Sequence, residues 1–453
     1  MNAIFFVSVI LKGIGAILEV LFQVLVTRKL GVDGYGTYST WINAADLIFW
    51  VGFSALTKCN TFYLSVPGSA MKSFKKKYYG RYVVPVLIIL SAAVIVGGKT
   101  PYCLIFVITA LELAAMDQSS TLLAQNQQMI SLVGEYVLGR AILLLGFEAL
   151  NVMGGLTPHA LVVLYGIQFL VIVLVFYAFR IKKKAHVNRT DISDTVSIGK
   201  WGSYQRADII QSLIGQVPVI LQYFSSGAFE AGVVSVVLTV KKLINFISGP
   251  TAKVFLPEFS RLYREGEKEK IRDCYASIMR IQMIFAGPLS VVLIGYPGVI
   301  LKILDKKLLQ YSFLFVLCSA VFIFAATLGP CSGVLQMTGN EKWDNQFREI
   351  AMAVMLGVMF LFRKDNLFVL YGLCAQALLE ESGKYYYVSK WMGGSPVKVR
   401  KYLSWWICPG IAIAISYWRG WNHSFIWMLL TGGITFLVSA AGELKNIRNL
   451  KVI

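Results

Sequence analysis

The stretch of the chain that decides the fold class is T-P-H-A-L-V-V-L-Y-G-I-Q-F-L-V-I-V-L-V-F-Y-A-F, residues 157–179. It contains no Asp, Glu, Lys or Arg. A run of about 20 mostly apolar residues has the length of an α-helix that crosses the hydrocarbon core of a bilayer. Because the backbone finds no water there, it must satisfy its own hydrogen bonds, as a helix does. The sequence therefore predicts a transmembrane helix at this position.

Similar apolar runs recur along the whole chain. Of its 453 residues, 57% are hydrophobic and 15% charged, too few polar groups for a soluble surface of ordinary size. Lys12 interrupts what would be the apolar core of a signal peptide, so we expect the first run to be a helix of the protein. We predict an all-α polytopic membrane protein with about fourteen spans. The predicted spans are 4–27, 38–57, 82–98, 101–122, 130–150, 157–179, 203–224, 229–248, 274–296, 311–337, 348–362, 367–388, 401–418 and 424–441.

The basic residues predict the orientation of these spans. A net charge of +19 could suggest a nucleic-acid partner, but the cations cluster in the loops that follow even-numbered spans. Lys and Arg beside membrane spans are retained on the cytoplasmic side. We therefore expect both termini in the cytoplasm and no nucleic-acid partner, with contact to anionic lipid as the alternative use of the charge. The clusters lie at 75–81, 182–184, 261–270, 398–401 and 445–448.

Signs of enzymatic chemistry are weak. The seven cysteines show no paired spacing, so neither a disulfide framework nor a metal site is indicated. The three histidines are scattered, and no nucleophile elbow or phosphate-binding glycine loop is present. We expect no enzyme activity, cofactor or metal. The alternative from another class is a membrane glycosyltransferase that uses the external acid Asp33, although residues 31–36 are better interpreted as a tight turn.

The chain contains a weak internal repeat. When the sequence is aligned with itself at one constant shift, a glycine turn and the polar helix face that follows it match a second copy. The same shift aligns span one with span seven. The alternative is chance matching of small residues. Six spans separate the copies, so two parallel lobes are expected, with a substrate site between them. We predict an N-lobe at 1–185, a C-lobe at 186–397 and two further spans at 398–453. The shift pairs Gly31, Gly36, Ser39, Asn43 and Asp46 with Gly227, Gly232, Ser235, Thr239 and Lys242.

Several ionisable side chains lie within the predicted spans. Such groups cost about 2.5 to 3.5 kcal/mol each at the bilayer centre on insertion scales, and they normally face a bundle interior or a water-filled cavity. We therefore predict a central polar cavity of mixed charge, and the alternative is that each group forms an interhelical ion pair or snorkels to the interface. Because Lys12 aligns with Asp208 and Asp46 with Lys242, we expect one cation and one acid on adjacent helices of each lobe.

Two motifs carry a family resemblance. The sequence R-K-L-G-V-D-G-Y-G-T-Y at 28–38 resembles the R-x-L-G-x-x-x-Y-G-x-Y turn of Wzx-type polysaccharide flippases. The stretch P-E-F-S-R-L-Y-R-E-G at 257–266 is similar to their cytoplasmic P-x-x-S-x-L-x-x-x-G loop. These proteins belong to the multidrug/oligosaccharidyl-lipid/polysaccharide exporter superfamily. The resemblance in span number, charge layout and repeat covers nearly the whole chain.

The resemblance implies a flippase in the bacterial cytoplasmic membrane. Its expected substrate is an undecaprenyl-diphosphate-linked oligosaccharide for surface polysaccharide such as O-antigen or lipopolysaccharide, with membrane lipid and a polysaccharide polymerase as partners. The alternatives within the superfamily are a multidrug cation antiporter and a lipid II flippase. We expect Lys12, Lys242, Arg140 and Arg206 to bind the headgroup, and Glu19, Asp46, Asp208 and Glu112 to serve in ion coupling or ion pairs.

Overall fold

The protein is helical throughout the part that its computed structural model describes, residues 3–54, 100–124, 127–182 and 198–448. The contacts between residues divide the chain into an N-terminal unit, Phe6–Gly232, and a C-terminal unit, Val233–Ile453 together with Met1–Phe5. Six of the described helical segments are long and apolar enough to cross a membrane. The predicted span 82–98 and the end of span 38–57 lie outside the described residues.

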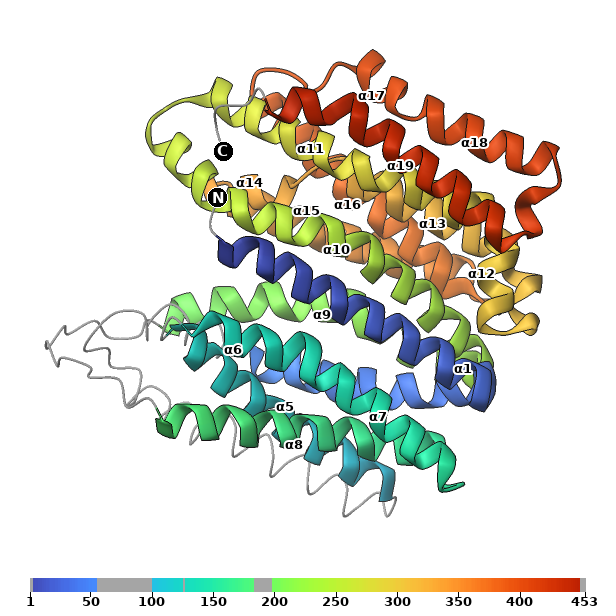
Figure 1. Ribbon diagram of the computed structural model, residues 1–453. Coiled ribbons are helices and arrows are strands. Elements are labelled where there is room, and N and C mark those ends of the chain that lie inside the picture. Colours follow the sequence, from blue (N-terminus) through green and yellow to red (C-terminus); the bar gives the residue numbers. More distant parts are fainter. Residues whose placement is uncertain (1–2, 55–99, 125–126, 183–197, 449–453) are drawn as a thin grey trace, which may run out of the picture. The chain divides into compact units, whose positions relative to one another are not determined.

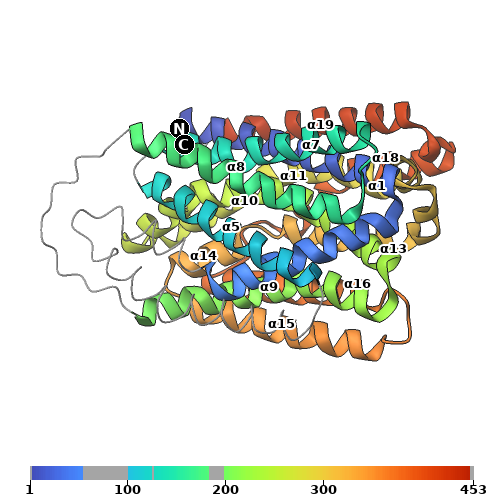
Figure 2. The same cartoon turned by 90° about the horizontal axis from the view of Figure 1, so that it is seen from below.

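The N-terminal unit is a bundle of long helices (Figure 1). In both views α5 lies beside α8 (Figures 1 and 2), and an added Cβ at Gly166 of α8 would lie in ordinary van der Waals contact with Ile108 of α5, 3.4 Å away. The elements are α1 (Ala3–Gly52), α5 (Thr100–Ala124), α6 (Gln128–Leu132), the π-helical segment η2 (Val133–Leu138), α7 (Gly139–Val152), α8 (Pro158–Lys182), α9 (Ile198–Ser226) and the start of α10 (Ala228–Arg264).

The turn between the first two predicted spans is shorter than residues 31–36. Only Gly31 leaves the helical conformation, with φ 74°, a backbone region that glycine enters without steric cost. One such residue is enough to redirect the chain, so the helix restarts at Val32. Asp33 is exposed in the first turn of the restarted helix, where a carboxylate is favoured by the helix dipole.

The C-terminal unit contains the remaining helices. In both views α11 lies beside α19 (Figures 1 and 2). The elements are the rest of α10, α11 (Lys268–Ser290), the π-helical η3 (Val291–Gly295), α12 (Pro297–Leu304), the 3-10 segment η4 (Lys306–Tyr311), α13 (Ser312–Thr327), α14 (Cys331–Met337), α15 (Glu341–Leu361), α16 (Phe368–Trp391), α17 (Val399–Trp405), α18 (Ile407–Trp418), η5 (Trp421–His423) and α19 (Phe425–Arg448).

Two details differ from the sequence-based expectation. The motif at 257–266 is not a loop up to its glycine, because α10 continues to Arg264 and the chain turns only at Gly266, with φ 75°. Its apolar residues Phe259 and Leu262 are fully buried, and that burial favours the helix over a solvated loop. The predicted span 311–337 is divided into α13 and α14 at Gly329, with φ 99°, followed by Pro330, which cannot donate a helical hydrogen bond.

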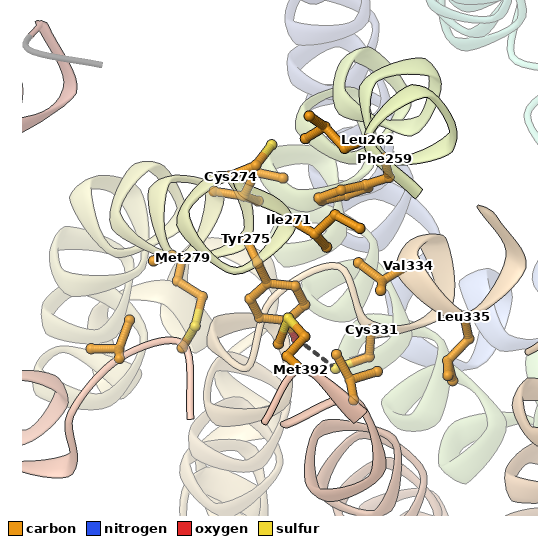
Figure 3. Close-up of a cluster of buried hydrophobic side chains, with 14 residues drawn as sticks. Phe259, Leu262, Ile271, Cys274, Tyr275, Met279, Cys331, Val334, Leu335 and Met392 are labelled. Carbon is orange, nitrogen blue, oxygen red and sulfur yellow. Dashed lines mark hydrogen bonds between the residues drawn. The ribbon is translucent and has the colours of Figure 1, made fainter. Parts of the chain in front are cut away.

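Tyr275 holds this break in place. The side chain is fully buried in a cluster formed by α10, α11, α14 and the end of α16 (Figure 3). Its hydroxyl donates to the Leu328 carbonyl at 2.7 Å, just after α13 ends, and lies 2.9 Å from Cys331 Sγ. A Cβ at Gly329 would lie 2.6 Å from the Tyr275 ring. This packing fixes the start of α14.

The last two spans are packed on the C-terminal unit through polar contacts. The buried Tyr296 hydroxyl lies 2.8 Å from Ser416 Oγ of α18 and 3.0 Å from Thr431 Oγ1 of α19. Arg280 of α11 forms an ion pair with Glu443 at 3.8 Å. The helices α18 and α19 are therefore integrated into the fold of this unit.

Candidate functional site

A cavity of about 190 Å³ lies inside the N-terminal unit. Its walls come from the second half of α1, from α5, from η2 and α7, and from α8. Aromatic side chains, among them Trp50 and Phe169, form part of the lining. The polar residues that line it are Asp46, Glu112, Glu135, Arg140, Tyr165 and Gln168.

The π-helical segment η2 aims two of these charges into the cavity. Glu135 and Arg140 are five residues apart, and in an α-helix such side chains point about 140° away from each other. In η2 the Gly139 amide donates to the Gly134 carbonyl, an i to i+5 bond that brings residues five apart back toward one face. Gly134 also makes room for Phe176, whose ring lies 2.3 Å from the position of an added Cβ.

Hydrogen bonds and an ion pair hold most of the charged groups at the cavity. The Tyr165 hydroxyl donates to Asp46 at 3.3 Å. Glu135 accepts a hydrogen bond from Ser119. Arg140 forms an ion pair with Glu19 of α1 at 3.4 Å.

Glu112 differs from these acids. Its side chain is 4% exposed, and its Oε2 atom has no hydrogen-bond partner among the residues that the structure describes. A buried carboxylate without a partner is costly. Among the described residues, four acids at the cavity, Glu19 included, face one cation, Arg140, and this charge favours a proton or a small cation over an anion.

The structure places the other predicted site residues at different positions. In the N-terminal unit, Lys12 lies 5.3 Å above the Tyr136 ring. Asp208 of α9 is buried and accepts a hydrogen bond from Ser54 at 2.8 Å, and Arg206 is exposed. Thus the cavity collects Asp46, Glu112 and Arg140 from the predicted set, with Glu19 as the ion-pair partner of Arg140.

In the C-terminal unit, Lys242 of α10 is exposed. Its neighbour Lys241 is partly buried and contacts other helices of the unit. Lys241 lies 5.1 Å from the Phe322 ring and 3.5 Å from Gln376. Two adjacent lysines point about 100° apart on a helix, so the rotation of α10 decides which of them faces inward.

Sequence reasoning missed a buried ionic network in the C-terminal unit. Lys384 of α16 is fully buried, and its Nζ lies 2.8 Å from Asp344 and 2.5 Å from Glu380. Arg348 lies 3.3 Å from Asp344 and 3.4 Å from Glu380. The available signal was the pairing of opposite charges four residues apart on two consecutive helices.

No curated protein matches the chain by sequence. A family model described as polysaccharide biosynthesis protein matches residues 83–335, more than half of the chain. The chain belongs to this family. This match confirms the resemblance to polysaccharide biosynthesis proteins at the level of the family. It does not distinguish the Wzx type.

Solved structures confirm the fold. The lipid II flippase MurJ, in an inward closed conformation, is similar with a TM-score of 0.68 at 13% identity, over 99% of this chain and 100% of that chain. An inward-facing multidrug resistance transporter of the MATE family gives 0.58 at 12% identity, over 85% and 98%. A transporter of the same superfamily from Pyrococcus furiosus gives 0.55 at 13% identity, over 86% and 95%. The protein is a multi-pass membrane protein with a flippase or transporter fold.

Proposed function

We propose that the protein flips an undecaprenyl-diphosphate-linked oligosaccharide from the inner to the outer leaflet of the bacterial cytoplasmic membrane, for surface polysaccharide assembly. The observation that carries the proposal is the full-length agreement with the fold of a lipid II flippase, in a chain of the polysaccharide biosynthesis family. The MATE-family structure and the Pyrococcus furiosus transporter match about six-sevenths of the chain, whereas the match to MurJ covers 99% of it.

The physical task fits a two-lobe transporter. A sugar headgroup would lose its hydrogen bonds to water in hydrocarbon, so a polar path must replace them while the lipid tail stays in the bilayer. Two lobes that rock about a central site would expose this path to each side in turn. Export of an anion from a negative interior is favoured by about 2.3 kcal/mol per charge per 100 mV.

For the headgroup we propose the cations Lys12, Arg206 and Lys242. The sequence predicts the same role for Arg140, but this residue lines the acidic cavity and is paired with Glu19, so we assign it to coupling instead. Arg206 and Lys242 are exposed and Lys12 is partly exposed, and this exposure supports the proposal. Lys12→Ala should abolish flipping at normal membrane abundance. Flipping by Lys12→Ala at the normal rate would remove this residue from the proposed site.

For coupling we propose the acidic cavity of the N-terminal unit, with Glu112 as the group that takes up the proton or cation. Asp46 and Glu19 supply further negative charge to this cavity. Asp208 lies apart from the cavity lining, with Ser54 as its partner.

One observation favours a multidrug cation antiporter as the second candidate, because the cavity is acidic and partly aromatic. Its size argues against that function. Pockets for drug-sized ligands occupy about 300 to 1,000 Å³, and this cavity has about 190 Å³, which suits a proton or a small ion.

Deletion of the gene tests the main proposal. We expect lipid-linked oligosaccharide to accumulate in the inner leaflet while its synthesis continues, as measured by glycolipid extraction and by labelling of the outer leaflet. Expression of the intact chain should restore export. Unchanged surface polysaccharide with increased drug sensitivity would instead support the multidrug antiporter.

A further inference from the structure

The buried network of the C-terminal unit surrounds one ammonium group with oxygen atoms. Three oxygens lie within hydrogen-bonding distance of Lys384 Nζ: Glu380 Oε1 at 2.5 Å, Asp344 Oδ1 at 2.8 Å and Ser332 Oγ at 2.9 Å. The Lys384 side chain has no exposed surface. Carboxylate and hydroxyl oxygens that converge on one buried point are also the ligands that hard metal cations prefer.

The surrounding helices hold the two carboxylates through their other oxygen atoms, independently of Lys384. Gln336 of α14 donates to Asp344 Oδ2 at 2.9 Å, and Gln376 donates to Glu380 Oε2. Ser332 and Gln336 are four residues apart and so share one face of α14. The break at Gly329 and Pro330 starts this helix where both side chains reach the network.

The formal charges select the kind of cation. Within the network, the two carboxylates Asp344 and Glu380 balance the two cations Arg348 and Lys384. Loss of the Lys384 charge would leave an excess of one negative charge. A monovalent cation restores neutrality, whereas a divalent cation would reverse the sign.

We propose that the ammonium of Lys384 permanently occupies a monovalent-cation site in the C-terminal unit, formed by Asp344, Glu380 and Ser332. The wild-type chain then binds no sodium at this point, because the site carries its own covalently attached cation. Sodium gains access only when the ammonium is removed. The inference stands apart from the transported substrate, because it concerns ion occupancy alone.

The test replaces Lys384 by Met, which keeps most of the apolar stem, ends one atom short of Nζ and leaves the oxygens in place. Lys384→Gln is the second variant, since its amide can still bond to Glu380 if the methionine variant does not fold. Lys390→Met, at an exposed position of the same helix, is the matched control. Purified full-length proteins in nanodiscs are titrated with radioactive sodium and melted in sodium chloride or choline chloride at equal ionic strength.

We expect Lys384→Met or Lys384→Gln to bind one sodium ion per chain more than the wild type, and to gain thermal stability in sodium with a saturable dependence. Lys390→Met should match the wild type. The double variant Lys384→Met with Glu380→Gln is neutral again and should lose the extra sodium. A folded Lys384 variant with wild-type sodium binding, or a double variant that binds as much as the single one, would overturn the proposal.

Discussion

At the scale of single residues, Glu112 and the residues around it define what the N-terminal cavity can bind. Asp46 and Glu135 each accept a hydrogen bond from a neighbouring hydroxyl. Glu112 Oε2 lacks such a partner within the described ranges. A buried carboxylate with an open acceptor beside other acids is the best placed group to gain and lose a proton or a cation.

Glu112→Gln should lower transport on the order of tenfold, with normal membrane abundance, because the amide keeps the shape but cannot take up a proton or balance a cation. Export should also lose its dependence on the applied ion gradient. The measurement is flipping of lipid-linked oligosaccharide per inserted protein. Glu148→Gln, exposed on α7 of the same unit, is the control. Gradient-dependent export by Glu112→Gln at the wild-type rate would contradict the assignment.

Two cysteines far apart in sequence meet in the C-terminal unit. Cys318 of α13 and Cys374 of α16 are buried, and their sulfur atoms lie 3.5 Å apart. The membrane-permeant oxidant copper phenanthroline should therefore join them by a disulfide. A protease site inserted at 363–366, between α15 and α16, makes the link visible on a non-reducing gel. After cleavage, the two fragments should stay linked when both cysteines are present and should separate when Cys374→Ala is introduced. Separation in both proteins would show that α13 and α16 are packed differently.

At the scale of the elements, the repeat appears as matching backbone geometry. The aligned glycines Gly31 and Gly227 both have positive φ, 74° and 109°, and each is followed at once by a new helix. Gly36 faces Ala228, and its aligned partner Gly232 faces Val32. This reciprocal contact is what a two-fold relation between the two turns produces.

Gly36→Ala should destabilise the protein, because the methyl carbon would lie 1.8 Å from the Ala228 carbonyl oxygen and 2.7 Å from the Gly232 nitrogen. Backbone must move to admit it, so we expect a loss of about 1–3 kcal/mol or more, seen as a lower melting temperature and lower membrane abundance. Gly215→Ala is the control, since no atom lies within 4 Å of its added Cβ. A Gly36→Ala protein as stable as Gly215→Ala would show that the helix at Gly36 packs less closely against the start of α10.

At the scale of the whole molecule, the distribution of basic residues predicts one orientation in the membrane. From residue 100 onward each predicted span coincides largely with described helices, whereas α12 (Pro297–Leu304) and η4 lie between two predicted spans and the span 311–337 is divided. If the predicted spans alternate, we expect the turn at Gly154 outside and the turn at Gly266 inside.

Alkaline phosphatase fusions test this orientation. Fusions at Gly154 and Gly98 should be active, because the enzyme folds only outside the cytoplasm, and fusions at Gly266 and Lys183 should be inactive. Gly98 and Lys183 lie outside the described residues, so the assay extends the map to them. Activity at Lys183 or Gly266 would reverse the predicted orientation.

The sequence by itself determined the helical fold and the turns at Gly31 and Gly227, but not the break at Gly329 or the continuation of α10 to Arg264. In hydrocarbon each helix satisfies its own backbone, so a span depends on a local run of apolar residues and can be read from about 20 neighbours. The turns at Gly31 and Gly227 are equally local, because they depend on the conformational freedom of one residue.

Only the tertiary structure decided which polar groups share a site. Glu112, Glu135 and Arg140 reach one cavity because of how α5, η2 and α7 are rotated and packed, and the π-helical segment changes that rotation by a fraction of a turn. The same holds for Lys241 against Lys242, and for Lys384, whose oxygen partners come from three different helices. Side-chain direction depends on helix rotation and on close contacts between distant segments, and neither is a local property of the sequence.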